Sequence, residues 1–235
     1  MAAFRRTRGG FTLVELLVVV VIIGVLVALV MPAVMSARRT AQRAKCVNYL
    51  REIVQATIAY ENNKQKFPGA ISSGPQNSTR TWVVEILPYI GRDDVFQTWR
   101  RGPGQVVQIN QFACPNDTDA LANTAALSYV ANLNLFRDVR NQPPQSRISM
   151  SDVKAAGRTP MFSEKLGSGP WNTTNDISKL TFQWPATTAN ATIGSSKCVT
   201  SNHQGGSHIA FGDGSVAFVP DDTACNDYLG NPVTR

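Results

Sequence analysis

The sequence predicts an α+β protein in which a long N-terminal helix, membrane-spanning in its first half, packs on a head with an antiparallel β-sheet. Three observations support this class. A nearly unbroken apolar stretch near the N-terminus is followed by apolar residues at intervals of three and four. Short apolar runs separated by turn residues come next. Two further apolar runs flank a Gly-Asp-Gly turn near the C-terminus, which favours an antiparallel hairpin.

The chain has 235 residues and a formal net charge of +7, which suggests a nucleic-acid partner until the charges are located. Residues 1–10 carry a net charge of +3, residues 11–31 carry −1, and residues 32–66 carry +5. Residues 67–235 hold 13 basic and 13 acidic side chains and are neutral. Because a nucleic-acid-binding domain normally carries the basic excess itself, we expect no nucleic acid as a partner.

Residues 11–31 form the predicted transmembrane helix. Eighteen of these 21 residues are apolar, and at about 1.5 Å per residue they span roughly 31 Å, the thickness of a bilayer's hydrocarbon core. The stretch is longer than the apolar core of an ordinary secretory signal, and no A-x-A cleavage site follows it. Basic residues flank it almost equally on both sides, so charge alone does not orient it.

Glu15 is the one charged residue in this stretch. A carboxylate in hydrocarbon costs several kcal/mol, which makes Glu15 a candidate functional residue. It lies near one end of the span, so its carboxylate could reach the membrane surface. The alternative is that it pairs with a cation supplied by a neighbouring subunit, which would relieve the desolvation of both charges.

The start of the span, Arg8-Gly9-Gly10-Phe11-Thr12-Leu13-Val14-Glu15-Leu16, resembles the class III signal of type IV prepilins and type II secretion pseudopilins. The resemblance implies that residues 1–10 are a leader, that a prepilin peptidase cuts between Gly10 and Phe11, and that Phe11 becomes N-methylated. It implies that Glu15 pairs with the terminal amine of an adjacent subunit during filament assembly. Gly24 and Pro32 fall where pilins commonly have a glycine and a helix-loosening proline. The implied assembly residues are Phe11, Glu15, Gly24 and Pro32.

Residues 32–66 are expected to continue as an extramembrane amphipathic helix. Pro32 lacks an N–H and should kink or locally unwind it. Apolar or small residues then recur in steps of three and four, at Val34, Ala37, Ala41, Ala44, Val47, Leu50, Val54 and Ile58. We expect the helix to reach about Asn63 and to stop at Phe67-Pro68-Gly69. One face would then pack on the head.

Residues 67–235 form the predicted α+β head. The segment 82–87 is ambiguous between helix and strand. Strand-like runs occur at 106–109, 127–130, 160–162 and 180–184. At the C-terminal end a β-hairpin is predicted at 207–219, because Gly212-Asp213-Gly214 suits a tight turn.

A second resemblance rests on His203-Gln204-Gly205-Gly206 and Phe211-Gly212-Asp213-Gly214-Ser215-Val216, which have a His-x9-Asp-Gly spacing. The pattern is similar to the C-terminal motif of a large bacterial family of prepilin-like proteins of uncharacterised function. Further segments agree with that family in order, namely Cys46-Val47-Asn48-Tyr49-Leu50, Ile86-Leu87-Pro88-Tyr89-Ile90, Phe112-Ala113-Cys114-Pro115-Asn116-Asp117, Ser128-Tyr129 and Ser163-Glu164. The resemblance implies a pilin-like architecture over nearly the whole chain, and it does not indicate what the motif residues His203, Asp213 and Gly214 do.

The four cysteines contain no C-x-x-C pair, and this spacing argues against a zinc site. In an exported head they would form two disulfides, for which three pairings are possible. We favour Cys46–Cys114, which ties the helix to the head, and Cys198–Cys225, which ties the tail around the hairpin. Four buried free thiols are the alternative. Disulfides need an oxidising compartment, which places the head in the periplasm and the N-terminus in the cytoplasm.

Catalysis and metal binding have only weak candidates. His203 and Asp213 could form an acid–base pair, but no nucleophile motif accompanies them. We expect His203 to hydrogen-bond across the hairpin and Asp213 to shape its turn. Asp213, Asp221 and Asp222 could offer oxygen ligands to calcium, although no EF-hand loop is present. We therefore predict no enzyme and no cofactor, with calcium as a weak candidate.

These observations predict a prepilin-like structural subunit of the inner membrane, single-pass, with its head in the periplasm. It would assemble into a type II secretion pseudopilus or a type IV pilus-like filament. The expected partners are the prepilin peptidase, other pilin-like subunits, the filament assembly machinery and the membrane. The alternative is a membrane-tethered extracytoplasmic binding module that does not polymerise, with the polar loops 167–178 and 186–196 as its recognition surface.

Overall fold

A computed structural model describes residues 11–122, 125–137, 147–153, 155–173, 175–182, 199–221 and 223. The chain forms two units, one ending at Gln42 and the other beginning at Arg43. Some sequence predictions concern residues outside the described ones, namely those on Gly10, Cys198, Cys225, Asp222 and the segment 186–196.

Helix α1 (Leu13–Lys64) contributes to both units. It is helical without interruption through Pro32, so of the two alternatives expected there, a kink or local unwinding, the unwinding does not occur. A proline removes only one hydrogen bond, and a long helix in apolar surroundings keeps the others. The helix ends one residue beyond the predicted Asn63, where Gln65 takes a left-handed conformation with φ of 56° and donates its N–H to the Glu61 carbonyl.

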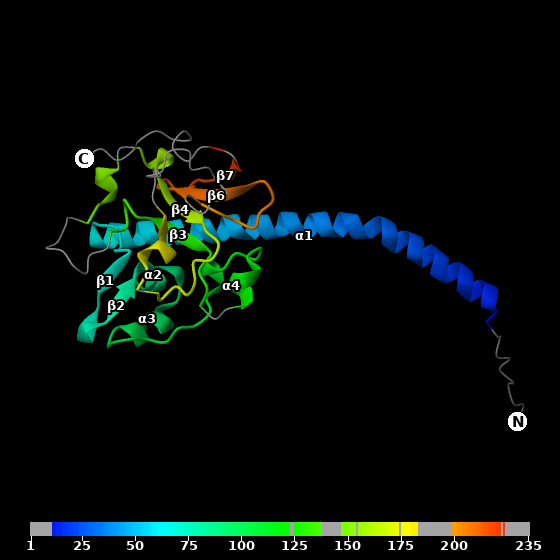
Figure 1. Cartoon of the computed structure of the whole chain (residues 1–235), viewed down its shortest axis with the longest axis horizontal. Helices are drawn as coiled ribbons and strands as arrows, with labels where there is room; N and C mark the ends of the chain where they lie inside the picture. Colours follow the sequence, from blue (N-terminus) through cyan, green and yellow to red (C-terminus); the bar gives the residue numbers. More distant parts are fainter. Residues whose placement is uncertain are drawn as a thin grey trace, which may run out of the picture. The chain divides into compact units, whose positions relative to one another are not determined.

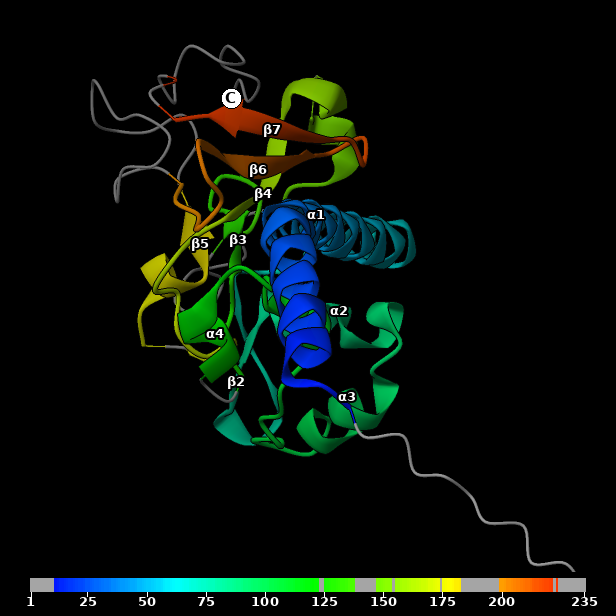
Figure 2. The same cartoon turned by 90° about the vertical axis from the view of Figure 1, so that its right-hand side faces the viewer.

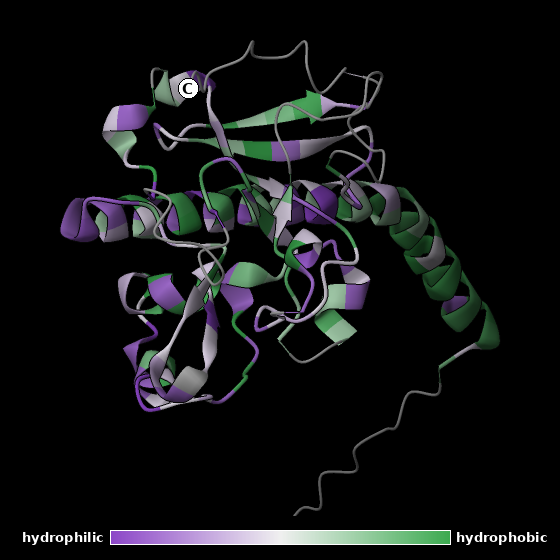
Figure 3. Cartoon of the chain, turned by 60° about the vertical axis from the view of Figure 1, so that its left-hand side comes forward, coloured by the Kyte–Doolittle hydropathy of each residue, from purple (hydrophilic) through white to green (hydrophobic). Residues whose placement is uncertain are grey.

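The first unit is the N-terminal part of α1, and its large apolar side chains are exposed. By length and composition, α1 is able to cross a membrane, and its most apolar window is not buried within the protein. Figure 3 shows this half of the helix in nearly continuous green, the colour of hydrophobic residues. A surface of this kind requires lipid or protein around it.

The second unit contains a five-stranded sheet with the strand order β5-β3-β4-β6-β7. The strands are β3 (Tyr129–Asn132), β4 (Pro160–Glu164), β5 (Thr181–Phe182), β6 (Gly206–Phe211) and β7 (Val216–Pro220). Neighbouring strands are antiparallel, except that β3 and β5 run parallel. A separate antiparallel pair consists of β1 (Ile71–Ser73) and β2 (Thr79–Thr81). The hairpin of β6 and β7 begins one residue before the predicted 207–219 and ends one residue after it.

Short helices occupy much of the remaining described chain. The α-helices are α2 (Trp82–Ile86), α3 (Asp93–Trp99) and α4 (Thr118–Ala122). The 3-10 helices are η1 (Pro75–Asn77), η2 (Leu87–Ile90), η3 (Asn110–Phe112), η4 (Met150–Asp152), η5 (Ala156–Arg158) and η6 (Ile177–Lys179). In Figures 1 and 2 the second half of α1 has the five-stranded sheet on one side and α2 and α3 on the other.

One hydrophobic core joins these elements. The part of α1 beyond Arg43 buries one face, at Cys46, Leu50, Ile53, Val54, Ala56, Thr57, Tyr60 and Glu61. Trp82 of α2 is fully buried, packs its ring against Phe112 and Phe162, and donates its indole N–H to the Leu180 carbonyl. The second half of α1, the sheet and most loops are therefore held together by one shared apolar core, beside a small separate cluster of Ala113, Ala120 and Ala126.

One strand prediction differs from the structure, and the segment left open between helix and strand is now assigned. The ambiguous segment 82–87 is helical, because α2 directs Trp82 and Val83 into the core. The predicted strand at 106–109 has no strand partner in the part of the chain that the structure describes. Its Val107 carbonyl instead accepts the indole N–H of Trp171, so a side chain takes the place of a neighbouring strand.

Candidate functional site

The β6–β7 hairpin positions the residues of the C-terminal motif. Gly214 has a φ of 85°, which only glycine adopts easily, and it lies in the turn between the strands. Asp213 accepts hydrogen bonds from the backbone N–H and the hydroxyl of Ser215, and these bonds hold the pKa of Asp213 below its ordinary value. Asp213 therefore shapes the turn, as the sequence predicted.

Glu164, at the end of β4, is the centre of a buried polar cluster. Its Oε1 lies 3.0 Å from Nε2 of His203, which lies three residues before the start of β6. Its carboxylate also lies 3.2 Å from Nδ1 of His208 and accepts the His208 backbone N–H at 2.9 Å. Glu164 is 2% exposed and each histidine 4%. We call Glu164, His203 and His208 the Glu-His cluster.

The charge of Glu164 is maintained by its two histidine neighbours. Burial raises the pKa of Glu164, but hydrogen bonds from His203 and His208 lower it by more, so its pKa lies below the ordinary value. The amide nitrogen of Asn116 lies 3.1 Å from Nδ1 of His203. Because the amide nitrogen is a donor, Nδ1 of His203 accepts this hydrogen bond. Nε2 of the neutral imidazole therefore carries the proton, which it donates to Glu164.

The disulfide between Cys46 and Cys114 adjoins the cluster. Cys46 lies on α1, and the bond confirms the predicted pairing that ties the helix to the head. The Cys114 sulfur lies 3.5 Å from Nε2 of His203. Both cysteines are buried, so the Glu-His cluster and the disulfide form one desolvated polar site inside the second unit.

A chain of contacts connects this site to the surface of α1. Arg43 donates a hydrogen bond of 2.6 Å to the carbonyl of Gln204, next to His203. Its guanidinium also lies 5.0 Å from the centre of the Phe218 ring, which in turn lies 5.1 Å from the ring of His208. The hairpin and the segment before it thus hold α1 through a hydrogen bond and a cation–π contact, and the Cys46–Cys114 disulfide ties α1 to the loop before α4.

Among the described residues, the site has no activated nucleophile of the kind that a hydrolase uses. The side chains of His203 and His208 contact Glu164, Asn116, Cys114, each other and Phe218, and no serine or threonine hydroxyl there hydrogen-bonds to either imidazole. The one sulfur beside His203 is in a disulfide. Activated nucleophiles are normally hydrogen-bonded to their base, so the arrangement suits fixing the hairpin onto α1.

Two groupings suggested by the sequence, an acid–base pair and a calcium site, are not seen among the described residues. His203 is paired with Glu164 of β4 and not with Asp213, so the hydrogen bond that we expected His203 to make across the hairpin is wrong. Asp213 and Asp221 belong to no group of three or more metal-binding side chains among the described residues. The sequence did not identify Glu164 or His208 as site residues, although the Ser163-Glu164 match had marked one of them.

Glu15 has a local partner that the sequence reasoning missed. Its carboxylate accepts hydrogen bonds from the backbone N–H of Thr12 at 2.9 Å and from the Thr12 hydroxyl at 2.7 Å. The Glu15 N–H returns a bond of 3.3 Å to that hydroxyl. This reciprocal capping box starts α1, and the Thr-x-x-Glu spacing could have predicted it. The other predicted assembly residues lie in α1 or just before it: Phe11 is exposed, a Cβ added at Gly24 would meet no atom within 4 Å outside the helix's own backbone, and Pro32 is helical.

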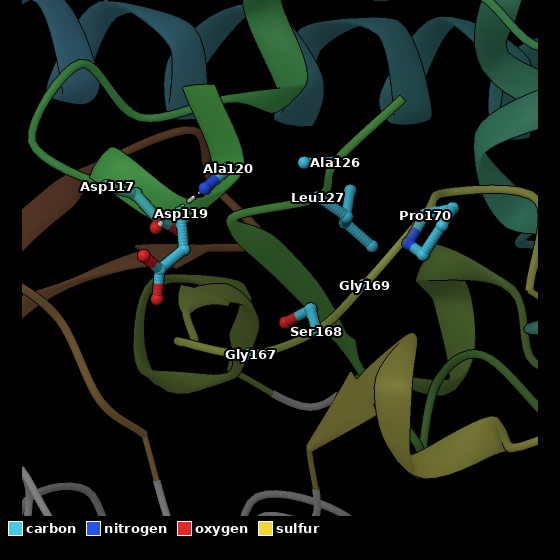
Figure 4. A pocket seen from close by; sticks show the side chains of 9 residues that line it. All are labelled: Asp117, Asp119, Ala120, Ala126, Leu127, Gly167, Ser168, Gly169 and Pro170. Atoms are coloured by element: carbon cyan, nitrogen blue, oxygen red, sulfur yellow. Dashed lines mark hydrogen bonds between the residues drawn. The ribbon is translucent and has the colours of Figure 1, made fainter. Parts of the chain in front are cut away.

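A surface pocket of about 460 Å³ lies beside α4. Figure 4 shows Asp117 and Asp119 on one side of it and Ser168, Gly169 and Pro170 on the other. Asp117 caps α4 by accepting the N–H of Ala120 and also accepts the hydroxyl of Ser128. Part of the predicted recognition loop 167–178 therefore borders a concave, acidic surface.

Comparisons with known proteins agree with these features. A family profile described as "Protein of unknown function (DUF1559)" matches residues 35–137 and 118–225. A second, described as "Prokaryotic N-terminal methylation motif", matches residues 5–31. No curated protein and no solved structure matches the chain.

Proposed function

We propose a function from the premise that this chain belongs to the family described as "Protein of unknown function (DUF1559)". The N-terminal methylation motif identifies it as a prepilin-like protein that prepilin peptidase processes. Together with the single apolar helix, the motif fits a single-pass membrane anchor. Cleavage before Phe11 would leave the whole of helix α1 in the mature subunit.

The proposed function is that of a structural subunit in a type II secretion pseudopilus or a type IV pilus-like filament. The observation that carries it is the first half of α1, whose large apolar residues from Leu13 to Met35 are exposed on all sides. In a membrane, this surface is covered by lipid. In a filament, it would be covered by the corresponding helices of neighbouring subunits. Such head-to-tail contacts do not close on themselves and so produce a filament.

The orientation proposed is N-terminus in the cytoplasm and head in the periplasm. The Cys46–Cys114 disulfide supports it, because such bonds persist in oxidising compartments. We also propose that the protein is not an enzyme. The positions of His203 and Glu164 support this, because both side chains are buried and interact with each other.

Replacing Glu15 by Ala tests filament assembly. The variant is expected to be processed and membrane-bound, with its filament fraction reduced at least about tenfold, because an unpaired terminal ammonium in low dielectric opposes docking of the next subunit. The measurement compares sheared filament and membrane fractions by immunoblot. Thr12→Val is the matched control, since it removes the capping hydroxyl but keeps the carboxylate.

The outcomes separate the possibilities. Filaments in normal amount from Glu15→Ala contradict the proposal. Equal loss in Thr12→Val and Glu15→Ala assigns the effect to the helix cap and contradicts an intersubunit ion pair.

The second candidate function is the membrane-tethered binding module. The pocket between α4 and residues 167–170 favours it, because it is a concave site of the size that small ligands occupy. Its acidic side chains would select a cationic or hydroxyl-rich ligand. An unassembled wild-type protein that binds such a ligand through this pocket would support the module over the filament subunit.

A further inference from the structure

We propose that the reduced form of this protein binds one Zn²⁺ ion at the site where the disulfide now lies, with Cys46, Cys114, Glu164 and His203 as its four ligands. All four side chains are buried, and their ligand atoms lie within 4.8 Å of one another. The residues come from α1, the loop before α4, β4 and the segment before β6. The inference concerns the second unit alone and does not depend on filament assembly.

The distances around the Cys114 sulfur approach those of a tetrahedral zinc site. With zinc–sulfur bonds of about 2.3 Å and zinc–nitrogen or zinc–oxygen bonds of about 2.0 Å, ligand atoms lie roughly 3.2–3.8 Å apart. The Cys114 sulfur is 3.5 Å from Nε2 of His203 and 3.9 Å from Oε1 of Glu164. That oxygen is 3.0 Å from the same Nε2. Three ligand atoms are therefore nearly in place, and the fourth becomes available when the sulfur–sulfur bond breaks.

The conversion balances as a two-electron reduction. A dithiol transfers two electrons and two protons to the disulfide, becomes a disulfide itself, and leaves Cys46 and Cys114 as thiols. Zinc then replaces the two thiol protons, which pass to solvent, and the thiolates bind the metal. The oxidised protein cannot form this site, because its two sulfur atoms are bonded to each other.

His203 and Glu164 are already held as ligands. Zinc at Nε2 moves the imidazole proton to Nδ1, where the Asn116 amide can accept it after turning its oxygen inward. Oε2 of Glu164 keeps the backbone N–H of His208 while Oε1 turns to the metal. Such outer contacts orient zinc ligands and strengthen binding. Zinc would thus tie α1 to the head in a chain that has not been oxidised, in place of the covalent bond.

The test uses the full chain in detergent micelles with Cys198 and Cys225 replaced by Ser, so that Cys46 and Cys114 are its only cysteines. A phosphine reductant opens the disulfide without competing strongly for metal. Co²⁺ added to the reduced protein is expected to give the visible bands of tetrahedral thiolate coordination at one equivalent. Zn²⁺ should abolish the bands, and the oxidised protein should give none.

Two variants and one control locate the site. His203→Ala and Glu164→Gln are each expected to weaken Zn²⁺ binding at least about tenfold, as loss of a ligand requires. Glu52 is an exposed glutamate of α1, and the Glu52→Gln variant should bind Zn²⁺ with the affinity of the parent. Near-ultraviolet circular dichroism of each reduced variant, compared with the reduced parent, establishes that it folds, and Cys46→Ser replaces any variant that does not.

Three results would overturn the proposal. The first is the absence of thiolate bands from the reduced parent. The second is equal metal binding by the oxidised and reduced forms. The third is parental Zn²⁺ affinity in folded His203→Ala or Cys46→Ser protein.

Discussion

Replacing Cys46 and Cys114 with Ala is expected to lower the free energy of unfolding of the second unit by about 4 kcal/mol, on the chain-entropy account of disulfides. The bond joins residues separated by 68 positions, so it restricts a long loop of the unfolded chain. It also fixes α1 to the loop before α4, beside the Glu-His cluster. Denaturant unfolding of the full chain in micelles, followed by tryptophan fluorescence, measures the change.

The double variant Cys198→Ala/Cys225→Ala serves as a comparison, because it leaves the Cys46–Cys114 bond intact. Peptide mapping without reductant should show Cys46 linked to Cys114 in that variant. An unchanged unfolding free energy after loss of the Cys46–Cys114 bond would show that the bond does not stabilise the attachment of α1 to the head.

Replacing Glu164 with Leu is expected to cost about 2–6 kcal/mol of stability, because it leaves two buried hydrogen-bond donors without an acceptor at about 1–3 kcal/mol each. The substitution leaves Nε2 of His203 and the N–H of His208 without their carboxylate acceptor. Glu164→Gln keeps one acceptor oxygen and should lose less. Unfolding curves under the same conditions as above give the order of stability.

Glu52→Leu is the matched control for this series, because Glu52 lies on the exposed face of α1 and should change stability by less than about 0.5 kcal/mol. Stability of Glu164→Leu equal to that of the control would contradict a structural role for the Glu-His cluster. In that case the cluster would have a role other than stability, and metal binding is the role that its geometry supports.

Local sequence signals predicted much of the fold. The apolar stretch and the three–four spacing identify α1 because both are properties of consecutive residues. The Gly-Asp-Gly turn locates the β6–β7 hairpin for the same reason. The pairing of β3 with β4 and β5 could not be predicted, because it depends on which apolar runs meet across the core. The run at 106–109 has a strand's composition but is held by the Trp171 side chain instead.

The candidate site was only partly predictable. His203 was identified from the motif spacing, but its partner is Glu164, 39 positions earlier, rather than Asp213. Strand β4 pairs with β6, and that tertiary pairing brings Glu164 beside both histidines. Metal-ligand spacing along the chain argued against zinc for a related reason: Cys46, Cys114 and His203 converge only through the fold. In contrast, the Thr12–Glu15 capping box could have been predicted, because its Thr-x-x-Glu spacing is a local sequence pattern.

The most direct test of the prepilin-like identity is the mass of the mature N-terminus, measured by mass spectrometry of the protein purified from membranes of a strain with prepilin peptidase. Cleavage between Gly10 and Phe11 with one added methyl group predicts an N-terminal peptide that begins with N-methyl-Phe11. A peptide that begins at Met1, at any other residue, or at an unmethylated Phe11 would contradict this account.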